Sequence, residues 1–230
     1  MFAYENQDKL RVAVDCIIFG FDQGVLKLLI VKRALEPEKG HWSLMGGFVK
    51  REETIDQSAD RILQELTGLA EVYMEQLHCF SGINRDPAER TISVAYTALI
   101  NIENHNSELS DAHGASWFSI DQIPDLIFDH HIMVAMAMEH LKYRASHFPV
   151  GFELLPDKFT MPQLQSLYEA IFDARMDKRN FIRRIEKLGI LVKLKEKTAG
   201  TGRKKAFLYQ FNEEKYLEQE KAGNRFLIKP

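Results

Sequence analysis

The stretch Gly47–Leu69, GFVKREETIDQSADRILQELTGL, decides the fold of the first half of the chain. It predicts a loop followed by a helix, because Thr54 is a favourable N-cap and Gln57, three residues later, completes a capping box. The helix is expected to end at Gly68, since glycine readily takes the left-handed conformation that follows a last helical turn. Apolar residues recur at the helical period and predict one buried face. They are Ile55, Ala59, Ile62, Leu63 and Leu66.

Strands are predicted on both sides of this helix. Residues 10–21 and 25–32 are apolar, β-branched runs joined at Asp22-Gln23-Gly24, which is a hairpin signal. Further strands are predicted at 74–81, 91–102 and 114–120. Asp129 can cap a second helix that continues to about Tyr143. Strands interrupted by two helices predict an α/β sandwich.

Composition limits the class of protein. The length of 230 residues allows one large domain or two small ones. With 45% hydrophobic and 27% charged residues, the chain is of the ordinary globular type. No apolar run reaches the ~18 residues of a membrane helix, and the start lacks the pattern of a secretory signal. Two cysteines, Cys16 and Cys79, make no disulfide framework, so we expect a cytoplasmic protein with no membrane partner.

The net charge of −3 hides an uneven distribution. Residues 174–205 contain 12 basic and 3 acidic side chains, a local charge of +9, which leaves −12 for the remainder. A basic segment on an acidic chain predicts a polyanionic partner for that segment.

The order of elements changes after residue 158. The segment 146–158 is rich in Pro and Gly and predicts a linker. Thr160 and Gln163 form a second capping box, and another helix is expected between Asp177 and Gly189. A strand, a basic loop and a returning strand follow at 190–194, 195–205 and 206–211. This order is typical of a winged helix-turn-helix.

The helix between Asp177 and Gly189 has the features of a recognition helix. Its apolar residues face one side, and arginine and asparagine lie near its N-terminal end, where such helices contact guanine and adenine edges. Lysines more often contact phosphates, and an arginine at the tip of the basic loop can enter the minor groove. The predicted DNA-binding residues are Lys178, Arg179, Asn180, Arg183, Arg184, Lys187, Arg203, Lys204 and Lys205.

The stretch that opened this section resembles the Nudix box, whose form is Gly, five residues, Glu, seven residues, then R-E-U-x-E-E-x-G-U with U apolar. Residues that fit are Gly47, Glu53, Arg61, Leu63, Glu65, Gly68 and Leu69. Ile62 and Leu66 stand where the family has glutamate. In active Nudix enzymes, these two positions and that of Glu65 bind the divalent metals that activate water on a diphosphate.

The two apolar replacements change the expected chemistry. Carboxylates at positions i, i+3 and i+4 project from one face of a helix and can hold Mg²⁺. Here only Glu65 remains on that face, so we expect a vestigial box with no catalytic residue, no metal and no cofactor. Arg61 and Glu53 can tie the loop to the helix. The alternative is an active pyrophosphatase that binds Mg²⁺ and acts on ADP-ribose or a related nucleoside diphosphate derivative.

The resemblance extends beyond the box. Arg85-Asp86-Pro87 and the segment 126–130 are similar to the ADP-ribose-handling branch of Nudix proteins. Residues 159–211 look like the winged helix of the Nudix-related transcriptional regulators. The resemblance implies a Nudix-like α/β/α sandwich with a C-terminal winged helix-turn-helix, acting as a dimeric repressor. Its small effector would be ADP-ribose or a sugar such as arabinose, and loss of metal carboxylates makes a neutral sugar somewhat more natural.

Candidate effector-binding residues are Trp42, Phe48, Arg85 and Tyr96. An aromatic residue on a predicted strand more often serves core packing than ligand binding. His130-His131 has metal-binding chemistry but no third ligand at suitable spacing, so no metal site is expected there.

The sequence therefore predicts a two-domain regulator. Residues 1–148 form the sensor, 156–212 bind a double-stranded DNA operator as a homodimer, and 213–230 are a tail of unassigned structure. A binding module for RNA or an acidic protein is the third alternative.

Overall fold

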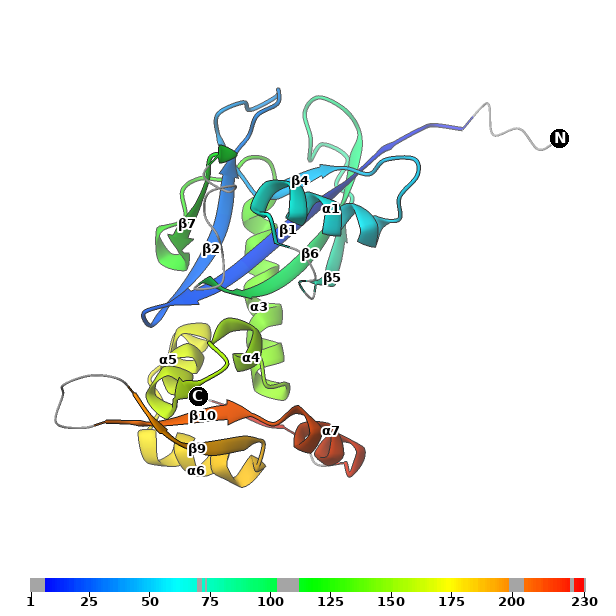
Figure 1. Cartoon of the computed structure of the whole chain (residues 1–230). Helices are drawn as coiled ribbons and strands as arrows, with labels where there is room; N and C mark the ends of the chain where they lie inside the picture. Colours follow the sequence, from blue (N-terminus) through cyan, green and yellow to red (C-terminus); the bar gives the residue numbers. More distant parts are fainter. Residues whose placement is uncertain are drawn as a thin grey trace. The chain divides into compact units, whose positions relative to one another are not determined.

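The computed structural model describes residues 7–69, 72, 74–102, 112–198, 205–223 and 226–229. The described residues form two compact units (Figure 1). The first contains most of the chain up to Ala137, and the second contains the chain from Met138 onward. No helix among the described residues is both long and apolar enough to cross a membrane.

A seven-stranded sheet makes up most of the first unit. Its main path runs β3-β2-β1-β6-β5, with β4 paired to β1 and β7 paired to β2. The strands are β1 (Arg11–Asp22), β2 (Val25–Lys32), β3 (Trp42–Ser43), β4 (Met45–Phe48), β5 (Met74–Phe80), β6 (Thr91–Asn101) and β7 (Ala115–Ser119). All five strands predicted from the sequence are present, and the hairpin turn places Gln23 and Gly24 at φ 48° and 85°.

Two helices accompany the sheet, α1 (Ile55–Thr67) and α3 (His130–His147), together with a short 3₁₀ turn, η2 (Ile120–Gln122). Figure 1 shows α1 on one face of the sheet and α3 along the other, which is the predicted sandwich. The capping box at the start of α1 forms as expected: the Thr54 N–H donates to Gln57 Oε1 at 2.8 Å, and the Gln57 N–H donates to Thr54 Oγ1 at 3.2 Å.

The buried face of α1 differs slightly from the predicted stripe. Ser58, Ala59, Ile62, Leu63 and Thr67 are buried. Ile55 is exposed and Leu66 is half-buried. The buried face is therefore rotated from the predicted stripe, and Leu66 lies at the wall of a cavity.

The central strands β1 and β2 are buried along most of their length, including Ile17, Phe19, Leu28 and Ile30. Both faces of these strands are covered, so the sequence is a continuous apolar run without alternation. Cys16 lies in this core as its neighbours suggested, and burial raises the pKa of its thiol.

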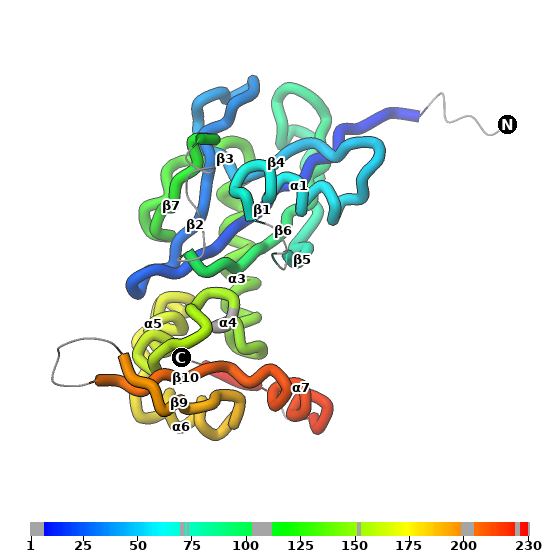
Figure 2. Tube along the Cα trace, viewed as in Figure 1, coloured from blue at the N-terminus to red at the C-terminus, as the bar shows by residue number. Residues whose placement is uncertain are grey.

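The second unit has the predicted winged-helix order and is followed most easily in the tube of Figure 2. Its elements are α4 (Gly151–Leu154), β8 (Phe159–Thr160), α5 (Met161–Phe172), α6 (Lys178–Leu188), β9 (Leu191–Lys197), β10 (Phe207–Phe211) and α7 (Glu213–Lys221). The three strands pair in the order β8-β10-β9. Strand β9 is longer than expected and takes in Lys195 and Lys197.

Two segments differ from expectation. The predicted linker 146–158 contains the end of α3 and the whole of α4. The tail contains α7, whose N-cap Asn212 accepts the Lys215 N–H at 2.9 Å. Beyond it, Phe226 and Ile228 are buried, and the Ile228 N–H donates to the Ser146 carbonyl at 3.0 Å.

Candidate effector cavity and nucleic-acid surface

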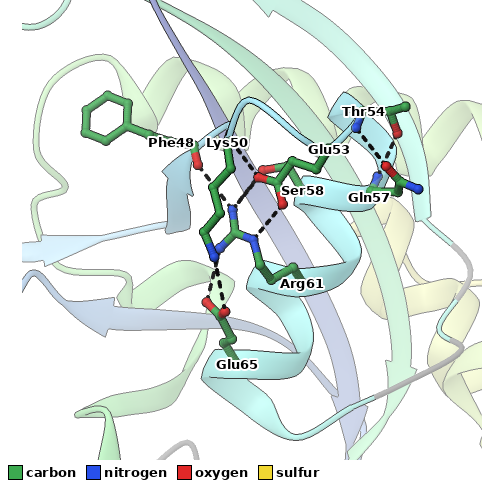
Figure 3. Close-up of polar contacts among 8 residues, drawn as sticks. All are labelled: Phe48, Lys50, Glu53, Thr54, Gln57, Ser58, Arg61 and Glu65. Carbon is green, nitrogen blue, oxygen red and sulfur yellow. Dashed lines mark hydrogen bonds and ion pairs between the residues drawn. The ribbon is translucent and has the colours of Figure 1, made fainter.

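Arg61 connects α1 to the loop before it (Figure 3). Its Nε and Nη2 donate to the Glu53 carboxylate at 2.8 and 2.7 Å, and Nη2 also donates to the Phe48 carbonyl at 3.1 Å. These hydrogen bonds from Arg61 lower the pKa of Glu53 to about 2. Arg61 and Glu53 therefore have the loop-fastening role expected from the sequence.

The same helix face does not fit a magnesium ion. Glu65 is paired with Arg61 Nη1 at 3.1 Å and Lys50 Nζ at 3.8 Å (Figure 3). Ile62 is buried, and its Cδ1 would stand 3.2 Å from a Cβ atom placed on Gly47. No group of three or more His, Cys, Asp or Glu side chains in the described ranges could hold a metal ion. Of the three metal-binding positions of the box, only that of Glu65 carries a carboxylate, and this carboxylate is already paired with two cations.

A cavity of about 220 Å³ lies beside this region, within the first unit. Strands β1, β2 and β4 supply part of its wall, and Leu66 supplies an apolar patch from α1. The polar and aromatic lining includes Asp15, Lys32, Arg33, Phe48, Arg85, Asp86, Phe128 and His130. Convergent charged groups in one concave region are typical of a small-molecule site.

The floor of the cavity is a buried ion-pair network. Arg85 donates from Nε and Nη2 to both Asp129 oxygens, at 3.0 and 2.7 Å, and its side chain is 4% exposed. Asp15 Oδ2 lies 3.8 Å from Arg85 Nη2 and accepts the Ser93 hydroxyl at 2.5 Å. A buried carboxylate needs such partners, since burial alone would favour its neutral form.

His130 completes the floor as a neutral side chain. The Leu44 N–H donates to His130 Nδ1 at 3.1 Å, so Nδ1 is unprotonated and the proton is on Nε2, 3.7 Å from Asp15 Oδ1. Burial is the main cause that lowers the His130 pKa. Gly46 is required opposite Asp15 in the β1–β4 pairing, because a Cβ atom there would overlap Asp15 Oδ1 and the Val14 carbonyl.

The predicted effector-binding residues occupy different places. Phe48 and Arg85 line the cavity. Trp42 packs edge-on against Phe118, with ring centres 4.9 Å apart, and Tyr96 donates from its hydroxyl to Asp56 on α1. Neither Trp42 nor Tyr96 is part of the cavity lining.

Six of the polar and aromatic lining residues named above were not predicted to bind an effector: Asp15, Lys32, Arg33, Asp86, Phe128 and His130. A signal was present for Asp15, since it is a carboxylate within an otherwise apolar strand. Asp86, Phe128 and His130 lie in the two segments that resemble the ADP-ribose-handling branch, whereas no local pattern marks Lys32 or Arg33.

The second unit presents the basic surface that the sequence predicted. Phe181 and Ile185 of α6 are buried, and Asp177 caps the helix by accepting the Asn180 N–H at 2.8 Å. The six predicted residues on this helix are all exposed: Lys178, Arg179, Asn180, Arg183, Arg184 and Lys187. Lys205 is exposed next to β10, whereas Arg203 and Lys204 lie outside the described residues.

Two of the α6 arginines already have partners. Arg183 Nη2 donates to Asn180 Oδ1 at 3.0 Å, so the two side chains form one polar group near the start of the helix. Arg184 Nη1 donates to the Lys229 carbonyl at 2.8 Å and fastens α6 to the C-terminal segment. Strands β9 and β10 and the basic loop between them are called the wing. On these strands, the Lys193 and Lys197 ammonium groups lie 4.0 and 4.5 Å from the centre of the Phe207 ring.

The fold and its two sites define a Nudix domain joined to a winged helix. Residues 9–136 match the NUDIX domain family, and residues 151–211 match the NrtR DNA-binding winged helix domain. The chain belongs to the NrtR family, in which these two domains occur together.

Two known proteins are similar to this chain over most of its length. The "ADPR responsive transcriptional repressor NtrR" of Acinetobacter baylyi is 32% identical over 204 residues, 87% of this chain and 81% of that protein. NrtR of Shewanella oneidensis, solved with a 27mer DNA, is 29% identical with a TM-score of 0.80, covering 94% of this chain and 97% of the other.

The Nudix domain alone has relatives of two kinds. The NUDIX domain of Shewanella oneidensis NrtR, solved with ADP ribose, has a TM-score of 0.54 at 29% identity, over 61% of this chain and 94% of that one. An ADP-ribose pyrophosphatase of Methanocaldococcus jannaschii is 35% identical over 119 residues, 52% of this chain and 68% of that protein.

Proposed function

We propose that this protein is a transcriptional repressor that binds operator DNA through α6 and the wing and is controlled by ADP-ribose bound in the cavity of the first unit. The observation that carries the proposal is similarity over nearly the whole chain to an NrtR structure that holds DNA. The exposed basic face of α6 supports the same role. The relatives named for ADP-ribose support that effector over arabinose, the sugar that the sequence left open.

The experiment for DNA binding is gel retardation with the promoter next to the protein's own gene. We expect retardation that unrelated duplex DNA competes away only weakly. Single-stranded nucleic acid is the control for the third alternative, because winged helices bind the grooves of a duplex. Equal binding of promoter and unrelated duplex would contradict the proposal.

The active form is proposed to be a homodimer, which would place two copies of α6 about 34 Å apart on a near-palindromic site. Light scattering on the free protein and footprinting on the promoter measure these two quantities. A monomer that protects only one half-site would contradict this part of the proposal. A cytoplasmic location accords with action on DNA.

A second candidate function is ADP-ribose hydrolysis, which the similarity to the pyrophosphatase favours. Against it, Ile62 is buried, Leu66 is apolar and Glu65 is paired with Arg61 and Lys50. We therefore propose that the domain senses ADP-ribose without cleaving it.

The hydrolysis test is incubation with ADP-ribose and Mg²⁺ or Mn²⁺, followed by measurement of AMP and ribose 5-phosphate. We expect no release above that of the Glu65→Gln variant. Turnover in the unaltered protein that Glu65→Gln abolishes would identify an enzyme.

A further inference from the structure

The cavity must compensate the charge of a diphosphate if ADP-ribose is the effector, and the box residues do not fit the divalent cation that would otherwise do so. Three cationic side chains line the cavity: Lys32, Arg33 and Arg85. The inference below concerns which of them binds the anion, and it rests on the proposed effector.

Arg85 is already committed to carboxylates. It donates to both oxygens of Asp129, lies 3.8 Å from Asp15, and is almost wholly buried. Its positive charge is compensated within the protein, so its main contribution is to hold the two carboxylates in place.

Arg33 is held differently. Its Nε donates to the carbonyls of Leu35 and Pro37 at 3.0 and 2.7 Å, and its guanidinium carbon lies 5.2 Å from the centre of the Phe128 ring. No described residue forms a hydrogen bond or ion pair with its two terminal nitrogens. The guanidinium is therefore fixed in position while its outer edge remains available for a bidentate anion contact.

The Phe128 ring packs against the Arg33 guanidinium and helps to fix its position. The backbone of Phe128 has φ 52°, a conformation that is unfavourable for residues other than glycine, and its ring meets the His130 ring edge-on with centres 5.8 Å apart. Strained residues of this kind cluster at ligand sites. The turn that places the Phe128 ring beneath Arg33 also supplies Asp129 and His130 to the floor of the cavity.

The acidic side chains of the cavity can accept hydrogen bonds from a sugar. Asp15 and Asp86 line the cavity, and Asp86 accepts only the Ala88 N–H, at 2.9 Å, among the described residues. Carboxylates accept hydrogen bonds from hydroxyl groups and repel phosphates.

We propose that Arg33, stacked on Phe128 and assisted by the neighbouring Lys32, binds the diphosphate of the effector directly and takes the place of the divalent cation, while Asp15 and Asp86 accept hydrogen bonds from ribose hydroxyls. ADP-ribose binding is then independent of Mg²⁺. The site selects phosphorylated sugars over neutral ones.

The test is calorimetric titration of the full chain with ADP-ribose, once in EDTA and once in Mg²⁺. The unaltered protein should bind equally under both conditions, and ribose or arabinose should bind far more weakly. Arg33→Gln should weaken binding about tenfold to a hundredfold, the loss typical of a hydrogen bond to a charged group. Arg90→Gln is the matched control, because Arg90 also donates to loop carbonyls, those of Ser81 and Gly82, but does not line the cavity.

Promoter binding in the absence of ADP-ribose reports whether Arg33→Gln is folded, and it should equal that of the unaltered protein. ADP-ribose binding that is unchanged in Arg33→Gln, or that is lost in EDTA, would overturn the inference and leave the proposed function standing. Failure of the unaltered protein to bind ADP-ribose under either condition would overturn the proposed effector itself. Tight arabinose binding would overturn both.

Discussion

Two arginines of the first unit and two basic residues of α6 have opposite environments. In the first unit, Arg61 and Arg85 are mostly buried, with 22% and 4% of the side chain exposed, and both donate to carboxylates. On α6 of the second unit, Arg179 and Lys187 are exposed, and no ion pair joins them to any described residue. Basic side chains therefore fasten the fold at these two positions of the first unit and are available to a partner at these two positions of α6.

The two environments predict different effects when a basic side chain is removed. A buried cation with a carboxylate partner is costly to remove, because the carboxylate is left buried and uncompensated. An exposed cation contributes little to folding but can neutralise a phosphate and release counterions. Removing a buried, paired cation should therefore lower folding stability, and removing an exposed cation of α6 should lower DNA affinity.

The largest effect is expected for Arg85→Ala. This change leaves Asp129 and Asp15 buried without their cation, so the free energy of unfolding should fall by about 3–5 kcal/mol in urea denaturation. Arg11→Ala is the control, since its pair with Glu89 is exposed on both sides and should change stability by at most about 1 kcal/mol. Equal losses for the two variants would contradict the comparison.

Arg179→Ala should act on DNA binding. If Arg179 contacts a base, the variant loses about 1–3 kcal/mol of promoter affinity, measured by fluorescence anisotropy, and discriminates less at one position of the site. Arg184→Ala is a sharper control than a distant residue, because Arg184 lies on the same helix but donates to the Lys229 carbonyl. We expect it to lower thermal stability more than specificity. The reverse ranking would assign Arg184, and not Arg179, to the DNA.

Local signals account for what the sequence predicted well. The caps at Thr54 and Thr160, the turn at Gln23-Gly24 and the buried face of α6 all depend on residues a few positions apart. The Arg85–Asp129 pair joins residues 44 positions apart. The sequence placed both residues in segments that resemble the ADP-ribose-handling branch but did not predict that they pair. The cavity floor could not be predicted because its partners become neighbours only through the tertiary fold.

The tail, residues 213–230, contains structure that its composition did not predict. Its charged, mixed sequence gave no expected element, although Asn212 followed by Glu213 and Glu214 is a helix-start pattern. Phe226 and Ile228 are buried beyond that helix. Their contacts depend on the end of α3, which no window of the tail sequence contains.

The dependence of folding stability on pH should distinguish His130, at the cavity, from Glu53, in the Nudix box. Because burial lowers the His130 pKa below 6.5, the unfolded chain binds a proton that the folded chain does not, so stability should fall as pH decreases below about 6.5. Glu53, with a pKa of about 2 against 4.5, acts in a different window: its contribution is lost as pH falls from about 4.5 to 2.

His130→Asn tests the first window, since asparagine can still accept the Leu44 N–H but does not titrate. Urea denaturation at pH 7 and pH 5 should show a smaller decrease in stability for this variant. An unchanged decrease would place the titrating group elsewhere.

The smallest effect concerns the wing. Reversing Lys204 and Lys205 to glutamate should weaken binding to every duplex and lower the slope of log affinity against log salt by about 1 for each lost phosphate contact. Lys9→Glu, an exposed charge reversal in the first unit, is the control and should leave the slope unchanged. An unchanged slope in the Lys204 and Lys205 variant would place the wing away from the DNA.

The central claim joins the two units functionally: ADP-ribose in the cavity controls DNA binding by α6. Its most direct test is promoter binding followed by fluorescence anisotropy during titration with ADP-ribose, in EDTA, with ribose as the neutral control. We predict that ADP-ribose releases the protein from the promoter and that ribose does not. Promoter affinity that stays constant at saturating ADP-ribose would contradict the account.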